Sequence, residues 1–152
     1  MKKIISLVAL LGIFLCTVNV YGASSQDDRG AEIYYRKCMA CHQVTGTGIP
    51  GTFPPLKGSD FLKSASKKRL INQVMNGSNE HLTVNGVTYS TPMPPQVDNI
   101  QDAVAVINFI LNSWGNNYGK ATIEDAKEVK PVKQNNGMMM NGMEMMKKNN
   151  TR

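Results

Sequence analysis

The segment Cys38-Met39-Ala40-Cys41-His42 places two thiols and one imidazole within five consecutive residues. This C-x-x-C-H pattern is typical of covalent haem attachment. Two cysteines three positions apart at a helix end can reach the two vinyl groups of one porphyrin, and the adjacent histidine is then directed at the iron from one side. We therefore predict one haem c, bonded through Cys38 and Cys41 and ligated by His42.

Other uses of paired cysteines fit this sequence less well. A structural zinc site needs four ligands, but past the amino-terminal segment there is no third cysteine and only one other histidine, His81. A thioredoxin-like redox disulfide belongs to a βαβ context, which the flanking sequence lacks. An oxidising compartment would permit a disulfide between the pair, but cysteines attached to haem cannot form one.

The ligand on the opposite face of the haem has several candidates: Met75, His81, Met93 and the methionines near the end of the chain. Met93 lies among three prolines that restrict the backbone and leave its side chain little choice of direction. Such a loop suits a weak thioether ligand. Met75 falls on the apolar stripe of a predicted helix and fits an ordinary core position. His81 follows a polar turn and fits a solvated surface position.

The first 22 residues have the order of a secretory signal peptide: Lys2 and Lys3, an apolar run over 4–15, then smaller residues. We predict cleavage after Gly22 and a periplasmic or otherwise exported protein. A retained membrane anchor is the alternative, although the run is about half the roughly 20 residues that a span needs. Lipid attachment at Cys16 is a further alternative, disfavoured because Leu15 is too bulky for that processing site.

The charge pattern excludes nucleic-acid binding. The net charge of the whole chain is +6, and removal of residues 1–22 lowers it to +4. Residues 26–116 carry a net charge of only +1, whereas residues 117–152 carry +3. Nucleic-acid recognition needs a dense cationic face with readable motifs, and neither is present.

Periodicity predicts an all-α domain over residues 23–119, with about three to four helices and a small β-hairpin. The covalently bound haem that the attachment motif predicts would be buried among these helices. The hairpin is indicated by two short apolar runs, 82–84 and 87–89, around Asn85-Gly86, a dipeptide that suits a type I′ turn. The last helix is expected to start near Asn99, with Asp98 as its cap. The other helices are predicted over residues 27–37, capped by Ser25, over 67–76, and as a short turn over 60–63.

Residues 120–152 are predicted to be mostly disordered, because the segment contains few aliphatic side chains to offset the entropy of ordering. Six of the ten methionines of the chain fall within residues 138–146. Thioethers are soft ligands that suit Cu(I), so this segment could bind copper. The alternative is a segment whose methionines dock loosely on a partner or a membrane surface.

Beyond the attachment motif, several stretches give the chain a family resemblance: 38–43, 46–62, 83–89 and Met93-Pro94-Pro95. Over Gly30 to Asn116 the chain resembles class I cytochromes c, most closely the monohaem domains found alone or fused to copper-containing nitrite reductases. The resemblance implies that Met93 is the distal iron ligand and that Pro54 accepts a hydrogen bond from the ring of His42. It also implies that Gly30 and Tyr34 pack on the last helix near Phe109.

The resulting expectation is an outer-sphere single-electron carrier between respiratory redox proteins, with a nitrite reductase or a terminal oxidase as possible acceptors. It would not be an enzyme and would have no small-molecule substrate, because histidine and methionine fill both axial positions of the iron. Two rival functions stay open. One is an enzyme or gas sensor with a free sixth position, and the other is a copper-handling protein that uses the methionine-rich segment.

Overall fold

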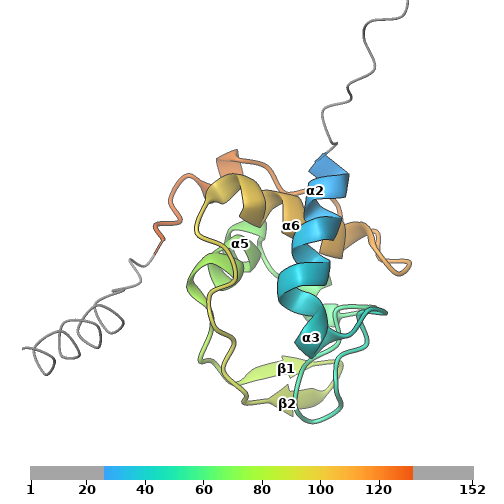
Figure 1. Ribbon diagram of the computed structural model, residues 1–152. Coiled ribbons are helices and arrows are strands. Elements are labelled where there is room, and N and C mark those ends of the chain that lie inside the picture. Colours follow the sequence, from blue (N-terminus) through green and yellow to red (C-terminus); the bar gives the residue numbers. More distant parts are fainter. Residues whose placement is uncertain (1–25, 132–152) are drawn as a thin grey trace, which may run out of the picture.

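The computed structural model describes residues 26–131, which form a mainly helical domain with one β-hairpin (Figure 1). Helices α2, α5 and α6 surround the middle of the molecule, and the hairpin closes it at the end where α3 lies. This arrangement confirms the predicted fold class. No helix within 26–131 has the length and apolar character to cross a bilayer. The predicted signal peptide, the Ser25 cap and the methionine-rich stretch at 138–146 lie outside the described residues.

The attachment motif terminates a long helical stretch. Helix α2 (Gln26–Ile33) continues without a break into a π-helical segment, η1 (Tyr34–Cys38), and then into α3 (Met39–His42). In η1 the N–H of Met39 donates to the carbonyl of Tyr34, five residues earlier. The sequence predicted a regular helix up to residue 37. A π-turn widens the helix by one residue per turn and is frequent at functional sites, and here it lies directly before Cys38.

Helices α2 and α6 (Ile100–Asn112) cross closely because residue 30 has no side chain. A Cβ atom at Gly30 would overlap the carbonyl oxygen of Ala105 on α6. One turn later, the ring of Tyr34 packs against Phe109 with centroids 5.3 Å apart. The structure therefore confirms the packing that the resemblance implied. The cap prediction for α6 is wrong: Asn99, not Asp98, accepts the free N–H of Asp102 at 2.9 Å.

Helices α4 (Asp60–Ser64) and α5 (Lys67–Asn76) form where they were predicted. Ser59 and Ser66 cap them by accepting backbone N–H groups, as short hydroxyl side chains favour. Strands β1 (Leu82–Val84) and β2 (Val87–Tyr89) pair antiparallel in the expected register. Both residues of the connecting turn, Asn85 and Gly86, have positive φ, which a type I′ turn requires.

Residues 117–131, here called the C-terminal strap, correct the predicted domain boundary. The short helix η2 (Glu124–Ala126) lies within this strap. The strap buries Ala121, Ala126 and Val129 in the main hydrophobic core. Small apolar residues spaced along a polar segment were too weak a pattern to indicate this packing. The expectation of disorder from residue 120 onward is therefore wrong for residues 120–131.

Candidate functional site

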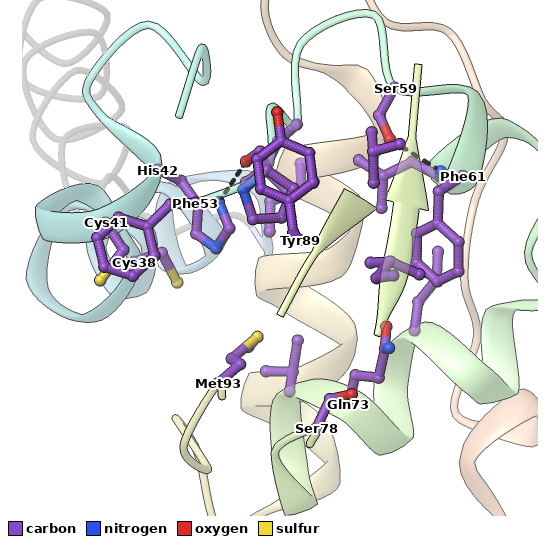
Figure 2. A pocket seen from close by; sticks show the side chains of 18 of the residues that line it. Cys38, Cys41, His42, Phe53, Ser59, Phe61, Gln73, Ser78, Tyr89 and Met93 are labelled. Carbon is purple, nitrogen blue, oxygen red and sulfur yellow. Dashed lines mark hydrogen bonds between the residues drawn. The ribbon is translucent and has the colours of Figure 1, made fainter. Parts of the chain in front are cut away.

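A cavity of about 300 Å³ lies between α3, α5, α6, the hairpin and the loop around Met93. Figure 2 shows the Cys38 and Cys41 sulfurs and the His42 ring on one side of it, with the Met93 thioether across from them. Most of the wall is apolar, and the lining aliphatic and aromatic side chains include Leu62, Leu70, Val74, Ile107 and Ile110.

Both cysteines of the motif lie at one edge of this cavity as free thiols. Cys38 is buried and Cys41 is half-buried. Burial, together with the neighbouring Cys41, raises the pKa of the Cys38 thiol to about 11. A free thiol at this position is therefore protonated at neutral pH, because its surroundings do not stabilise the thiolate. The environment is that of an apolar attachment point and differs from the electropositive sites of reactive cysteines.

His42 is oriented by one hydrogen bond. Its Nδ1 lies 3.0 Å from the carbonyl oxygen of Pro54. Because a carbonyl can only accept, Nδ1 carries the proton and Nε2 keeps its lone pair. Burial lowers the pKa of His42, although the bond to Pro54 opposes this shift, and the ring is therefore neutral at pH 7. A neutral imidazole with a free Nε2 and a carbonyl behind Nδ1 is the usual arrangement of a metal-ligating histidine.

The loop after the motif presents the Pro54 carbonyl through a close backbone approach at Gly48. The N–H of Gly48 donates to the carbonyl of His42 at 3.0 Å. Gly48 has a φ of +64°, and a Cβ atom there would overlap the carbonyl oxygens of Phe53 and Pro54. Only glycine combines this conformation with this contact. The hydrogen bond to His42 thus depends on a residue six positions along the chain.

Met93 is held at the opposite wall by a short backbone pairing with Ser78. The Ser78 N–H donates to the Met93 carbonyl and the Met93 N–H donates to the Ser78 carbonyl, both at 2.8 Å. Between α5 and Ser78, Gly77 has φ 75° and ψ −176°, a conformation that is essentially restricted to glycine. A Cβ atom there would also overlap the Met93 carbonyl oxygen.

The other candidates for the distal ligand lie elsewhere. Met75 is 2% exposed and belongs to the hydrophobic core. His81 is exposed, and its Nδ1 is 3.0 Å from the hydroxyl oxygen of Ser90. Neither lines the cavity, whereas Met93 does. Of the candidates within residues 26–131, the structure therefore brings only Met93 together with His42.

The donor set and the lining fit a flat apolar macrocycle that carries a metal in its own ring. A soft sulfur and an imidazole nitrogen face the same space, and two thiols stand at its edge. Within 26–131 no three His, Cys, Asp or Glu side chains gather into a site for a bare metal ion. The apolar wall of a cavity of this size would be in contact with water unless an apolar group of matching size covered it.

Sequence reasoning missed three contributors to this site. Gly48 and Gly77 support the two ligand side chains through close backbone contacts with Pro54 and Met93, and such tertiary contacts are not visible in an isolated sequence. Ser78 contributes only its backbone, so its side-chain type contains no signal. The cavity also has polar lining groups, Gln73 and Tyr89, for which no motif provided a hint.

The sequence of this domain is similar to sequences of known proteins. A family profile described as Cytochrome c matches residues 28–114. A Thermus thermophilus protein named "Cytochrome c-552" is 36% identical over 108 residues, which cover 68% of this chain and 75% of that protein. The "Alcohol dehydrogenase (quinone), cytochrome c subunit" of Gluconobacter oxydans is 32% identical over 103 residues, 66% of this chain but only 21% of that subunit.

Proposed function

Since this chain belongs to the cytochrome c family, whose members carry covalently bound haem c, we propose that it is an exported single-electron carrier with one haem. The observation that carries this proposal is the placement of His42 and Met93 across one apolar cavity with Cys38 and Cys41 at its edge. The sequence contains a single C-x-x-C-H motif, and one attachment site corresponds to one haem.

In this proposal Cys38 and Cys41 would form thioether bonds to the haem vinyl groups, His42 would bind the iron through Nε2, and Met93 would bind it through its sulfur. Pro54 keeps the imidazole of His42 in the tautomer that leaves Nε2 free. A histidine and methionine ligand pair raises the reduction potential, because a thioether favours ferrous iron.

Two filled axial positions favour electron transfer over catalysis. Oxygen or peroxide would have to displace Met93, whose backbone N–H and carbonyl both form hydrogen bonds with the backbone of Ser78. The surrounding prolines further restrict that loop. We therefore propose a carrier without a substrate of its own, in which the bound haem would supply one-electron chemistry and the protein its ligands and an apolar surrounding. The rival function, an enzyme or sensor with an open sixth position, requires that Met93 leave the iron.

The surface around the mouth of the cavity carries little charge. Residues 38–56 and 81–97 contain no Asp, Glu, Lys or Arg. Two charged side chains line the cavity, and each lies just before one of these segments: Lys37, and Glu80, which is paired with Arg69 at 2.7 Å. Met39 and Ile49 are exposed apolar residues within the first uncharged segment. Docking on this side is therefore driven by small apolar contacts, as is usual for brief redox encounters.

The donor and acceptor are redox proteins of the exported compartment. One relative is named as the cytochrome subunit of a quinone alcohol dehydrogenase, which is an example of such a cytochrome in a larger redox assembly. A nitrite reductase or a terminal oxidase is our proposal for the acceptor of this chain. Copper binding by residues 138–146 stays a prediction, because that segment lies outside the described residues.

The decisive experiment replaces each candidate distal ligand by alanine in the haem-loaded protein. Met93→Ala should retain haem through acid-acetone extraction, bind carbon monoxide rapidly when reduced, and have a lower reduction potential. Met75→Ala and His81→Ala are the controls and should bind carbon monoxide as slowly as the parent. If one of the controls opens the iron and Met93→Ala does not, the ligand assignment is wrong. Haem that extracts from the parent would refute covalent attachment.

The proposed docking surface has its own test, the salt dependence of electron transfer to small charged reagents. Oxidation of the ferrous protein by anionic hexacyanoferrate(III) should slow by less than about threefold between low and high salt. The reason is that the local charge around the mouth governs the encounter, and this local charge is close to zero. A steeper decline, as the net positive charge of the whole protein would cause, would show that distant cations govern the approach.

A further inference from the structure

We propose that the C-terminal strap, residues 117–131, is a positioning element for the distal methionine. It fixes the end of α5, and Ser78, which follows this end, holds the backbone of Met93 by hydrogen bonds. The inference rests on the proposed function in one respect, the role of Met93 as iron ligand. It assigns a functional effect to a segment that neither the attachment motif nor the family match includes, since the match ends at residue 114.

The strap is anchored to α6 by a two-sided hydrogen bond in the interior. Buried Asn108 donates through Nδ2 to the Ala121 carbonyl at 3.0 Å, and its Oδ1 accepts the Ala121 N–H at 2.7 Å. Both polar groups of one backbone residue are thus satisfied by one side chain. Buried backbone groups without hydrogen-bond partners destabilise a fold. This pairing therefore fixes where the strap enters the core.

The strap then follows α5 from its first turn to its last. At the first turn, Lys67 donates to the Tyr118 carbonyl at 2.7 Å and Lys68 forms an ion pair with Glu128. At the last turn, the side chain of Asn76 donates to the Lys130 carbonyl at 3.0 Å. Between these points Ala126 and Val129 are buried in the core that also contains residues of α5. The strap therefore restrains α5 at both ends.

The end of α5 is also the support of the Met93 loop. Gly77 and Ser78 directly follow Asn76, and Ser78 pairs with Met93 through the two backbone hydrogen bonds described above. The Val74 carbonyl accepts the N–H of Gln96 at 2.8 Å. Figure 2 shows Ser78 and Met93 together at the same wall of the cavity. Asn76 thus touches the strap on one side and continues into the support of Met93 on the other.

The expected consequence is a larger population of iron with an open sixth position when the strap is removed. Apparent affinity for an added ligand rises in proportion to the fraction of protein in the open, binding-competent state. Imidazole is a suitable probe, because it binds ferric haem only where the thioether has left. The intact chain should therefore bind imidazole more weakly than a chain that lacks the strap.

The experiment compares haem-loaded chains that end at Arg152, Pro131 and Gly119. Imidazole affinity and reduction potential should be equal for the first two, which differ only in the methionine-rich segment. The chain that ends at Gly119 should bind imidazole about tenfold more tightly and have a lower potential, since the hydrogen bonds that hold the strap to α6 and to the end of α5 are lost. Equal affinities in all three chains would overturn the proposal.

Point variants test the same link in case the shortest chain does not fold. Asn76→Ala removes the hydrogen bond to the Lys130 carbonyl and also a bond to Asn72 within α5, and it should tighten imidazole binding by about threefold. Asn72→Ala, which removes the bond within α5 but keeps the bond to Lys130, should leave the affinity unchanged. Lys68→Ala loosens the strap at the far end of α5 and is the matched control, with affinity unchanged. If Asn76→Ala matches the control, the strap is merely structural. Met93→Ala, made in each of these chains, tests the ligand assignment separately. If it leaves imidazole affinity unchanged, the ligand assignment is wrong; if it raises the affinity but the strap variants do not, only the positioning role is wrong.

Discussion

The two walls of the cavity differ in how the chain builds them. The His42 wall comes from one short stretch: thiols, imidazole and the Pro54 carbonyl all lie within residues 38–54, and a local hydrogen bond of 3.0 Å completes the arrangement. The Met93 wall is assembled from segments far apart in the sequence. The backbone of Met93 is hydrogen-bonded to Ser78, Ser78 follows the end of α5, and that end of α5 contacts the strap. One wall is local and covalent, and the other is tertiary and non-covalent.

This difference teaches where the protein can open. Thioether bonds and a ligand adjacent to them cannot be lost by small movements of the fold. A thioether ligand held by backbone pairing can leave when its support shifts. We therefore expect damage to the first wall to abolish the holoprotein, and damage to the second wall to change its ligation state. The four predictions below proceed from the largest expected effect to the smallest.

Loss of attachment at the covalent wall should have the largest effect. Cys41→Ala should weaken or abolish haem retention, and chains that lose haem should fail to fold stably. The reason is that loss of haem would expose the apolar wall of a cavity of about 300 Å³ to water, and small domains commonly depend on a bound metal or cofactor for part of their stability. The measurements are acid-acetone extraction and circular dichroism. A haem-free chain that unfolds cooperatively near the parent temperature would contradict this prediction.

Disturbing the tertiary wall at Gly77 should open the iron without loss of haem. Gly77→Ala adds a Cβ atom against the Met93 carbonyl oxygen in a backbone conformation that alanine avoids. We expect a loss of about 2–4 kcal/mol in the free energy of unfolding and tighter imidazole binding by ferric protein. Gly86→Ala is a control with a positive φ but no neighbour near the added atom; it should lose stability without gaining imidazole affinity.

The corresponding change at the covalent wall, Gly48→Ala, sharpens the comparison. The new Cβ atom would overlap the Phe53 and Pro54 carbonyl oxygens and displace the hydrogen-bond acceptor of His42. We expect a loss of about 1–3 kcal/mol in stability and a shift in potential, because the hydrogen bond tunes the basicity of the ligand. Imidazole affinity should stay near that of the parent. If Gly48→Ala opens the iron as widely as Gly77→Ala, the two walls are not independent.

The smallest effect is expected at Asp102, which touches neither wall. Burial would raise the pKa of Asp102, but hydrogen bonds from Arg29 and Asn99 outweigh it, and the pKa is lowered on balance. A carboxyl group with a lowered pKa in the folded state stabilises above its unfolded value of about 3.9 and loses that contribution as the pH falls further.

Asp102→Asn should therefore cost about 0.5–1 kcal/mol at neutral pH, as is typical of exposed pairs and caps. The difference from the parent should shrink below about pH 4 as the carboxyl group of the parent is protonated. Urea titrations at several pH values measure it. A difference that stays constant down to low pH would show that packing, and not charge, is responsible.

The sequence alone determined the chemistry of the His42 wall and the local elements. Cys38, Cys41 and His42 are neighbours in the chain, so their relation does not depend on the rest of the fold. The helix over 67–76 follows from the cap at Ser66 and from apolar periodicity, a short helical turn was indicated over 60–63, and the hairpin follows from Asn85-Gly86. These signals act over a few residues, and such signals can be read from a single chain.

Tertiary structure decided which distant groups meet. The sequence favoured Met93 over Met75 as the distal ligand, but only the folded chain places Met93 across one cavity from His42, because the two residues are separated by about fifty positions in the chain. It also placed residues 120–131 in the core, although their composition indicated disorder. The stabilisation there comes from three small side chains and from Asn108, on another helix. A segment that is stable only through such partners has no local pattern by which to predict it.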